Sequence, residues 1–222
     1  MKLNGLRKSE MNHHMNAYIW DLDGTLLDSY GVIVEGAAKT AAAAGLDDPV
    51  DEVLKAVKQG SVTGYLKDVS RRSGMPFEKL LAQYRLYSHE LDDRITLVDG
   101  AEETLEKLRH TGAVHYVYTH RGSSSEPILE RLGILHCFRE VVTSEFGFSP
   151  KPSGEGIRYL LGKYGLDPAR TWYVGDLTLD VFCAKDAGVR ALLYLPPDSC
   201  VSATGLEDRI VRDLREIASE AL

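Results

Sequence analysis

Hydrophobic positions in the second half of the chain alternate between short apolar runs and segments of helical spacing. The apolar runs, which predict buried strands, are residues 114–118, 141–142, 171–174 and 190–194. The helical segments are residues 101–111, 123–132, 154–164, 179–186 and 210–218. Serines followed by a glutamate at 123–126 predict a capping box for the second of these helices. This alternation predicts an α/β fold with a doubly wound, Rossmann-like parallel sheet.

The first half of the chain has a different pattern. One apolar run, residues 18–20, predicts a strand, but residues 30–95 carry only helical signals, such as the alanine-rich segment 37–44. We therefore predict a helical cap domain inserted between the first strand and the rest of the sheet. The predicted organisation is an N-terminal extension, a core domain in two pieces and a cap, at residues 1–16, 17–29 with 96–222, and 30–95.

Composition narrows the function classes. The chain has 222 residues, 44% of them hydrophobic, and a formal net charge of −7 without a basic block, so we expect no nucleic-acid partner. No apolar run approaches the roughly 20 residues that cross a bilayer, and we expect no membrane partner. Three cysteines without C-x-x-C spacing indicate reduced thiols in a cytoplasmic protein. We expect a monomer or a homodimer, which the sequence does not distinguish. His13 and His14 lack neighbouring partner ligands, so we assign them no metal.

Two acidic residues directly follow the first predicted strand. Asp21 and Asp23 stand at positions i and i+2 of an extended segment, so their side chains point to the same side. In open α/β sheets, ligands bind at this carboxyl edge. Two carboxyl groups this close cannot both ionise freely without a positive partner, so either a metal binds there or one carboxyl keeps its proton. Gly24 permits a sharp turn after the pair.

Other polar residues follow later strands. The Thr119 hydroxyl and the next backbone N–H can donate to a phosphate oxygen, although a threonine here also suits a helix cap. Lys151 lies between two prolines, which stiffen its loop, although most lysines are solvated surface charges. Asp176 follows the strand at 171–174 as the predicted N-cap of the next helix, and Asp180 lies one turn further on the same face.

Together these segments resemble the four motifs of the haloacid dehalogenase-like superfamily of phosphatases. The segment Asp-Leu-Asp-Gly-Thr-Leu-Leu-Asp-Ser at 21–29 resembles the first motif, and Thr119 the second. Lys151-Pro152 resembles the third motif, and Gly-Asp-x-x-x-Asp at 175–180 the fourth. The resemblance covers residues 18–188 and is nearest to the phosphoglycolate phosphatase and β-phosphoglucomutase-like subgroup.

The resemblance implies roles for these residues. Asp21 would be the nucleophile and Asp23 the general acid/base, and both would hold Mg²⁺, the second through its backbone carbonyl. Asp176 would also bind Mg²⁺, whereas Asp180 would either orient the metal or hold Lys151. The Lys151 ammonium would pair with the nucleophile and the phosphate.

The second motif carries one departure from the family. His120 stands where the family usually has asparagine, next to Thr119, which would bind the phosphate and take part in catalysis. Histidine titrates near neutral pH, so we expect His120 to face the cleft and to tune substrate binding.

The resulting hypothesis is a Mg²⁺-dependent phosphatase that hydrolyses a small phosphorylated metabolite through an aspartyl-phosphate intermediate. A phosphosugar mutase of the β-phosphoglucomutase type uses the same intermediate and remains an alternative. From another class, a phospho-acceptor domain or a non-catalytic binding protein on this fold remains open. Cap residues around 60–65, with Lys67, are candidates for reading the substrate, although an ordinary helix–helix turn explains them equally well.

Overall fold

The computed structural model describes residues 15–219, and the predictions for residues 1–14, including His13 and His14, lie outside them. A six-stranded parallel sheet forms the centre of the fold, in the order β5-β4-β1-β6-β7-β8. Its strands are β1 (Ala17–Trp20), β4 (Val114–Tyr118), β5 (Phe138–Val142), β6 (Thr171–Gly175), β7 (Arg190–Tyr194) and β8 (Arg209–Val211). Because the chain leaves β1 first to one side and then to the other, the sheet is doubly wound, as predicted.

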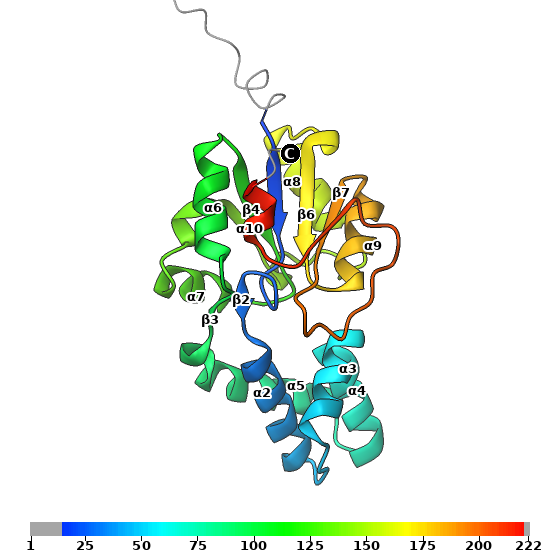
Figure 1. Cartoon of the computed structure of the whole chain (residues 1–222). Coiled ribbons are helices and arrows are strands. Elements are labelled where there is room, and N and C mark those ends of the chain that lie inside the picture. The colour runs from blue at the N-terminus through cyan, green and yellow to red at the C-terminus, as the bar shows by residue number, and fades with distance from the viewer. Residues whose placement is uncertain (1–14, 220–222) are drawn as a thin grey trace, which may run out of the picture. The chain divides into compact units, whose positions relative to one another are not determined.

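Helices cover both sides of this sheet (Figure 1). They are α6 (Ala101–His110), α7 (Ser125–Arg131), α8 (Glu155–Tyr164), α9 (Thr178–Ala187) and α10 (Arg215–Ser219). Three short 3₁₀ turns complete this part, namely η2 (Leu135–Cys137), η3 (Ser144–Phe146) and η4 (Pro168–Arg170). The predicted α/β, Rossmann-like fold is confirmed.

Alternate strand residues point to opposite sides of the sheet. Ile19, Tyr116 and Tyr173, from three neighbouring strands, pack in one apolar cluster with Ile157 and Leu160 of α8. On the other side, the indole Nε1 of Trp20 donates to Nδ1 of buried His115 at 3.0 Å. Both sides of the central strands are therefore buried, which explains why their sequences are apolar without alternation.

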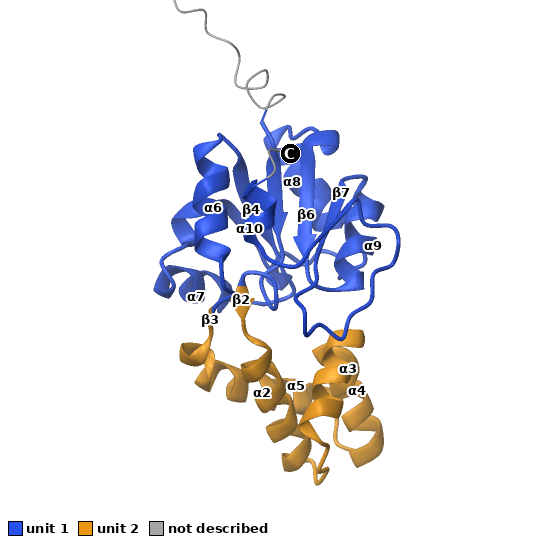
Figure 2. Ribbon diagram, viewed as in Figure 1, with its two compact units in different colours: residues 1–26, 97–222 blue, residues 27–96 orange. Residues whose placement is uncertain are grey.

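The described chain divides into two compact units (Figure 2). One contains the six-stranded sheet and comprises the described residues up to Leu26 and from Leu97 onward, and the other is Leu27–Thr96. The second unit contains the helices α2 (Tyr30–Ala43), α3 (Val50–Gln59), α4 (Val62–Ser73), α5 (Phe77–Glu90) and η1 (Asp92–Arg94). The short strands β2 (Leu27–Asp28) and β3 (Thr96–Leu97) pair where the chain passes between the units.

Two local predictions are wrong. Residues 210–218 were expected to form one helix, but β8 and the short helix α10 occupy this region. The sixth strand is only three residues long, so it leaves no periodic signal. The capping box at 123–126 is absent as well, because the side chain of the N-cap Ser124 makes no capping hydrogen bond. Its hydroxyl instead accepts a hydrogen bond from Arg121 Nη1 at 3.3 Å.

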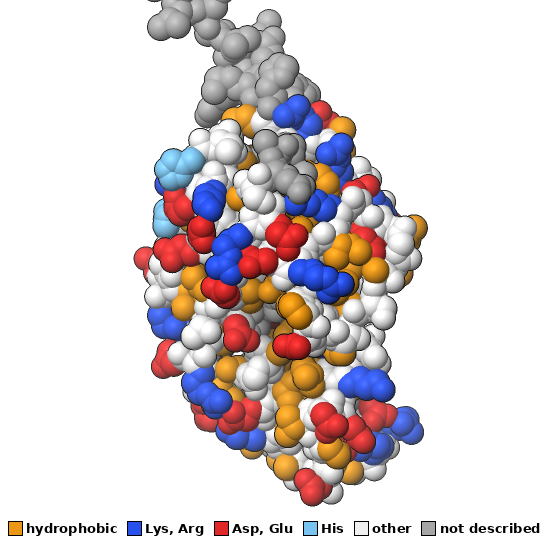
Figure 3. Space-filling model, in the orientation of Figure 1, with side chains coloured by type: hydrophobic (Ala, Val, Ile, Leu, Met, Phe, Trp, Pro, Cys, Tyr) orange, Lys and Arg blue, Asp and Glu red, His pale blue; other side chains and the backbone are white. Residues whose placement is uncertain are grey.

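No helix within residues 15–219 is both long and apolar enough to cross a bilayer. On the face drawn in Figure 3, basic side chains are scattered among acidic ones.

Candidate active site

The carboxyl end of β1 places the first acidic residue. The Asp21 N–H donates to Val174 O at 2.8 Å, which continues the β1–β6 pairing one residue past the strand. The chain then turns, with Gly24 at φ +80°, a left-handed conformation that favours glycine. Thr25 and Leu26 close the turn by donating their N–H groups to Leu22 O. Asp21 is thus held rigidly at the sheet edge and is buried.

Lys151 connects two carboxylates at this edge. Its Nζ donates to Asp21 Oδ1 at 2.7 Å and to Asp180 Oδ1 at 2.8 Å, and the lysine side chain is only 3% exposed. The rings of Tyr173 and Tyr118 lie 5.2 and 5.6 Å from Nζ, as measured to their centroids. Burial alone would lower the pKa of Lys151, but the carboxylates of Asp180 and Asp21 outweigh it and raise this pKa. The ammonium is therefore a fixed positive charge beside Asp21.

Three carboxyl groups converge on the same place. Each of Asp21, Asp176 and Asp180 offers an oxygen, and these oxygens all lie within 4.8 Å of one another. Burial raises the pKa of Asp21, and the neighbouring Asp180 raises it further, against the lowering effect of Lys151. When all three are ionised, these buried carboxylates and the single ammonium carry an excess of two negative charges. A divalent cation that prefers oxygen ligands, such as Mg²⁺, fits this donor set and would neutralise the excess.

Glycine at position 175 makes room for one of these acids. A Cβ added to Gly175 would overlap with both Cγ and Oδ2 of Asp180. Asp180 packs there because its Oδ2 accepts the Leu177 N–H at 3.1 Å, and the Tyr173 hydroxyl lies 3.3 Å from Oδ1. Asp180 therefore holds Lys151, one of its two expected roles, and its role toward a metal stays a prediction.

The helix that follows β6 corrects one prediction. Asp176 is not the helix N-cap, because α9 begins at Thr178 and Leu177 is the capping residue. Asp176 instead accepts a hydrogen bond from the Thr25 hydroxyl at 3.4 Å. Thr25 is fully buried, so the first motif also positions an acid of the fourth motif.

An arginine that we did not predict holds Asp23. Arg121 Nη2 donates to Asp23 Oδ1 at 2.7 Å, and its Nε lies 3.1 and 3.3 Å from the two carboxylate oxygens. The arginine side chain is 7% exposed and that of Asp23 is 23% exposed. Asp23 is thus oriented by Arg121 and lies outside the three-acid cluster. A basic residue two positions after Thr119 was the available sequence signal.

Thr119 and His120 lie at the end of β4. The Thr119 N–H donates to Val142 O at 3.0 Å, and its hydroxyl oxygen accepts the Arg121 N–H at 3.1 Å. Nε2 of His120 accepts the backbone N–H of Lys151 at 2.9 Å, so this nitrogen carries no proton. Desolvation of the ring and the Lys151 charge lower the pKa of His120 to about 4, although the residue as a whole is exposed. The hydrogen bond agrees with this direction, and the expected titration near neutral pH is wrong.

The candidate residues for substrate recognition lie in helix α4 and in the turn before it. Helix α4 begins at Val62, capped by Ser61, so only two residues separate it from α3. Tyr65 is buried in the core of its unit and donates its hydroxyl to Asp48 at 2.8 Å. The Lys67 ammonium lies 5.8 Å from the ring centroid of Phe77. Gly60 and Ser61 thus form a short turn between two helices, and a role of this segment in substrate recognition stays a prediction.

Known protein families and individual proteins that match this chain are hydrolases of phosphate compounds or belong to a hydrolase family. The family model described as haloacid dehalogenase-like hydrolase matches residues 18–194. A phosphoglycolate phosphatase of Agrobacterium fabrum is 30% identical over 185 residues, which cover 78% of each chain. A pyrophosphatase of Bacillus velezensis is 29% identical over 180 residues, which cover 79% of this chain and 81% of the relative.

A solved structure supports the fold. The crystal structure of a predicted phosphoglycolate phosphatase from Haemophilus somnus superposes with a TM-score of 0.81 and covers 97% of this chain and 99% of the other. At 23% sequence identity, this similarity concerns the fold alone.

Proposed function

Because the chain belongs to the haloacid dehalogenase-like hydrolase family, we propose that this phosphatase uses Mg²⁺ and an aspartyl-phosphate intermediate to hydrolyse a small phosphorylated metabolite. The predicted family and enzyme class are confirmed by the matches. The proposal on mechanism rests chiefly on one observation, the buried network in which Lys151 bridges Asp21 and Asp180. Such a network fixes a nucleophile and a positive charge where a phosphoryl group would react.

In the first half-reaction, an Asp21 carboxylate oxygen attacks phosphorus and the bond to the leaving oxygen breaks. Asp23, protonated for this step, gives its proton to the leaving oxygen. Lys151 and the Thr119 hydroxyl offset the charge on the equatorial phosphate oxygens. The product of this step is an aspartyl-phosphate on Asp21.

In the second half-reaction, water attacks the phosphorus of this intermediate, and Asp23 accepts a proton from that water. Arg121 supports this role, because a carboxylate held by two guanidinium N–H groups keeps one orientation. Inorganic phosphate leaves and the Asp21 carboxylate is regenerated. Arg121 acts here as a positioning residue for Asp23.

The proposed metal site uses the three-acid cluster. Asp21, Asp176 and Asp180, together with the backbone carbonyl of Asp23, are the groups that would hold Mg²⁺. The ion would supply charge neutralisation for the phosphate. Two residues position these ligands without binding the metal. The Thr25 hydroxyl hydrogen-bonds Asp176, and Gly175 leaves room for the side chain of Asp180.

The substrate is the open part of the proposal. The two relatives described above are named for phosphoglycolate and pyrophosphate hydrolysis, so relatives at about the same identity differ in substrate. A mutase would need a second phosphate site, and the paired arginines of α4 are poor candidates. Arg71 and Arg72 both form ion pairs with Asp68, and Arg72 also pairs with Asp48. We therefore favour transfer of the phosphoryl group to water.

The decisive experiment is a phosphate-release screen over a panel of phosphorylated metabolites, with Mg²⁺ and with EDTA. We expect release from small monoesters that depends on Mg²⁺. The Mg²⁺ titration is repeated with Asp176→Ala, which should need a higher concentration of the metal. Full activity in EDTA would contradict the metal assignment. Conversion of β-glucose 1-phosphate to glucose 6-phosphate, faster than phosphate release, would favour the mutase instead.

A further inference from the structure

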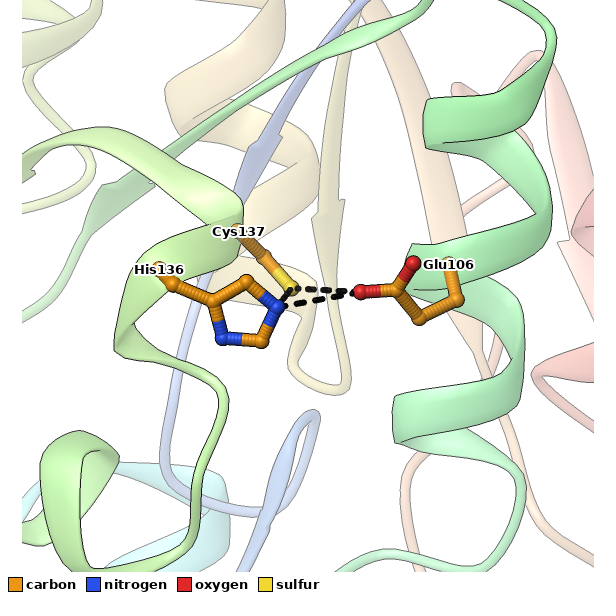
Figure 4. Close-up of side chains that lie close together, drawn as sticks. All are labelled: Glu106, His136 and Cys137. Atoms are coloured by element: carbon orange, nitrogen blue, oxygen red, sulfur yellow. Dashed lines mark hydrogen bonds and ion pairs between the residues drawn. The ribbon is translucent and has the colours of Figure 1, made fainter.

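A second group of side chains with metal-binding chemistry lies away from the carboxyl edge of β1. Glu106 extends from α6, and His136 and Cys137 are consecutive residues of η2 (Figure 4). Their ligand atoms point toward one another, and all lie within 4.8 Å of one another. The three side chains differ in burial: Cys137 is buried, Glu106 is half-buried and His136 is exposed. The proposed phosphatase chemistry uses none of them.

The spacing of the three atoms matches the face of a metal-centred tetrahedron. His136 Nε2 lies 3.1 Å from Glu106 Oε1, and the Cys137 sulfur lies 3.6 Å from each of them. Zinc binds sulfur at about 2.3 Å and nitrogen or oxygen at about 2.0–2.2 Å, with tetrahedral angles. Those bond lengths require edges of about 3.6 Å from sulfur and about 3.3–3.5 Å between nitrogen and oxygen. A metal could therefore enter with shifts of a few tenths of an ångström.

Neighbouring groups prepare the carboxylate. Arg109 Nη2 donates to Glu106 Oε2 at 2.7 Å and its Nε to the same oxygen at 3.1 Å, which leaves Oε1 turned toward the sulfur and the imidazole. Hydrogen bonds from Arg109 and His136 lower the pKa of Glu106 to about 2, so the carboxylate is ionised. An outer partner that fixes the orientation of a ligand is a usual part of protein metal sites.

The thiol needs one chemical change. Burial and the neighbouring Glu106 carboxylate raise the pKa of Cys137 to about 11, so the sulfur carries a proton in the metal-free protein. When a metal binds, the S–H bond breaks, the proton passes to solvent and a sulfur–metal bond forms. In the metal-free protein Nε2 of His136 donates to Glu106 Oε1, so metal binding also exchanges this proton with solvent, which leaves the ring proton on Nδ1 and Nε2 free to bind. No electron is transferred. The thiolate and the carboxylate offset the two charges of a divalent ion, and the Arg109 guanidinium beside Glu106 leaves one net positive charge at the partly exposed site.

We propose that Glu106, His136 and Cys137 form a binding site for Zn²⁺ or a similar divalent transition metal, with solvent in the fourth position. A sulfur, a nitrogen and an oxygen ligand suit zinc, whereas Mg²⁺ prefers oxygen ligands alone. The bound ion cross-links α6 to η2, which leads directly into β5. The site is distinct from the oxygen-only cluster of Asp21, Asp176 and Asp180.

The test is titration of the purified full chain with Co²⁺, with Mg²⁺ present throughout. A thiolate ligand gives a sulfur-to-cobalt charge-transfer band, which a carboxylate-only site cannot produce. We expect this band with one equivalent of Co²⁺, tetrahedral d–d bands in the visible region, and loss of both when Zn²⁺ is added. The readout is independent of phosphatase activity.

Matched variants identify the ligands. Cys137→Ser should abolish the charge-transfer band, and His136→Gln should weaken Co²⁺ binding by about 100-fold or more, beyond what loss of an outer partner costs. Cys200→Ser and His89→Gln are the controls, because both residues are exposed and belong to neither cluster. His136 is exposed, so its variant should fold even if Cys137→Ser does not.

A second measurement is the melting temperature with and without Zn²⁺. A ligand that binds only the folded state raises this temperature. We expect a rise for the wild type and for Cys200→Ser, and none for His136→Gln. Absence of the thiolate band in the wild type, or its persistence in Cys137→Ser, would overturn the proposal and leave an ordinary surface ion pair between Glu106 and His136.

Discussion

Among the described residues of the unit that contains the six-stranded sheet, two clusters of side chains that could bind a metal differ in how their charges are balanced. At the carboxyl edge of β1, three buried carboxylates face one ammonium, so the group is short of positive charge. At the α6–η2 cluster, Arg109 pairs with Glu106, and Cys137 keeps its proton. The first arrangement therefore needs a cation to be electrostatically complete, whereas the second is complete without one. We infer that the first site binds its metal for catalysis, whereas the second site binds a metal only when the free metal concentration is high enough.

The strongest test of this contrast removes the nucleophile. Asp21→Asn should lower kcat by about four orders of magnitude, because an amide cannot form the acyl phosphate. Steady-state phosphate release measures the loss, and Asp198→Asn in an exposed loop is the control. The cobalt–thiolate band should persist in Asp21→Asn. Near-wild-type turnover in the folded variant would refute the assignment of the nucleophile.

The next test removes the positive charge. Lys151→Met should destabilise the metal-free protein by about 3–5 kcal/mol, because two buried carboxylates lose their ionic partner. Urea denaturation measures this difference. Burial already raises the pKa of Asp21, and loss of the Lys151 charge, which lowers it, raises this pKa further. The destabilisation therefore grows as pH rises and Asp21 ionises. A loss below about 1 kcal/mol would show that the network contributes little to stability.

The third test concerns Arg121. Arg121→Lys keeps the charge but loses the two-pronged contact with Asp23, so we expect kcat to fall about 10–100-fold. KM should change little, and Arg121→Ala should be worse than the lysine variant. Arg158→Lys, whose arginine pairs with Asp186 on the surface, is the control. Equal effects on KM and kcat would indicate that Arg121 binds the substrate directly.

The smallest effect is expected at the second cluster. Glu106→Gln should change the free energy of unfolding of the metal-free protein by about 0.5 kcal/mol or less, since solvent screens its partly exposed ion pairs with Arg109 and His136. With Zn²⁺ added, only the wild type should gain stability. Urea denaturation with and without the metal measures both quantities. A large loss without metal would mean that the cluster is a structural ion pair, contrary to the contrast drawn above.

The sequence predicts those site residues that directly follow a strand, because parallel strands bring their carboxyl ends together. Asp21, Thr119 and Asp176 were found in this way, and the family resemblance added roles. Arg121 was missed, because its contact with Asp23 joins positions far apart in the chain. The Glu106 cluster was missed for the same reason, since η2 lies 29 positions or more along the chain from Glu106.

Other predictions differ from the structure, because side-chain packing and strand pairing outweigh the preferences of the local sequence. Tyr65 has glycines on its N-terminal side, yet it belongs to a helix whose apolar face it helps to bury. Strand β5 begins at Phe138, three residues before the apolar pair at 141–142. The sequence pattern did not show this start, because the first residues of the strand are charged or partly exposed. Backbone pairing with β4, and not hydrophobicity, defines that part of the strand.

The paired strands β2 and β3 bear on how this chain could have acquired its second unit. They hold the entry and exit of residues 27–96 next to each other, and the Val98 N–H donates to Leu26 O at 3.0 Å. When the two ends of an inserted segment already meet, lengthening or exchanging it costs little chain entropy, about 0.6 kcal/mol for each doubling of its length. A chain with this junction can replace its insert by recombination while the sheet and its carboxyl edge stay unaltered.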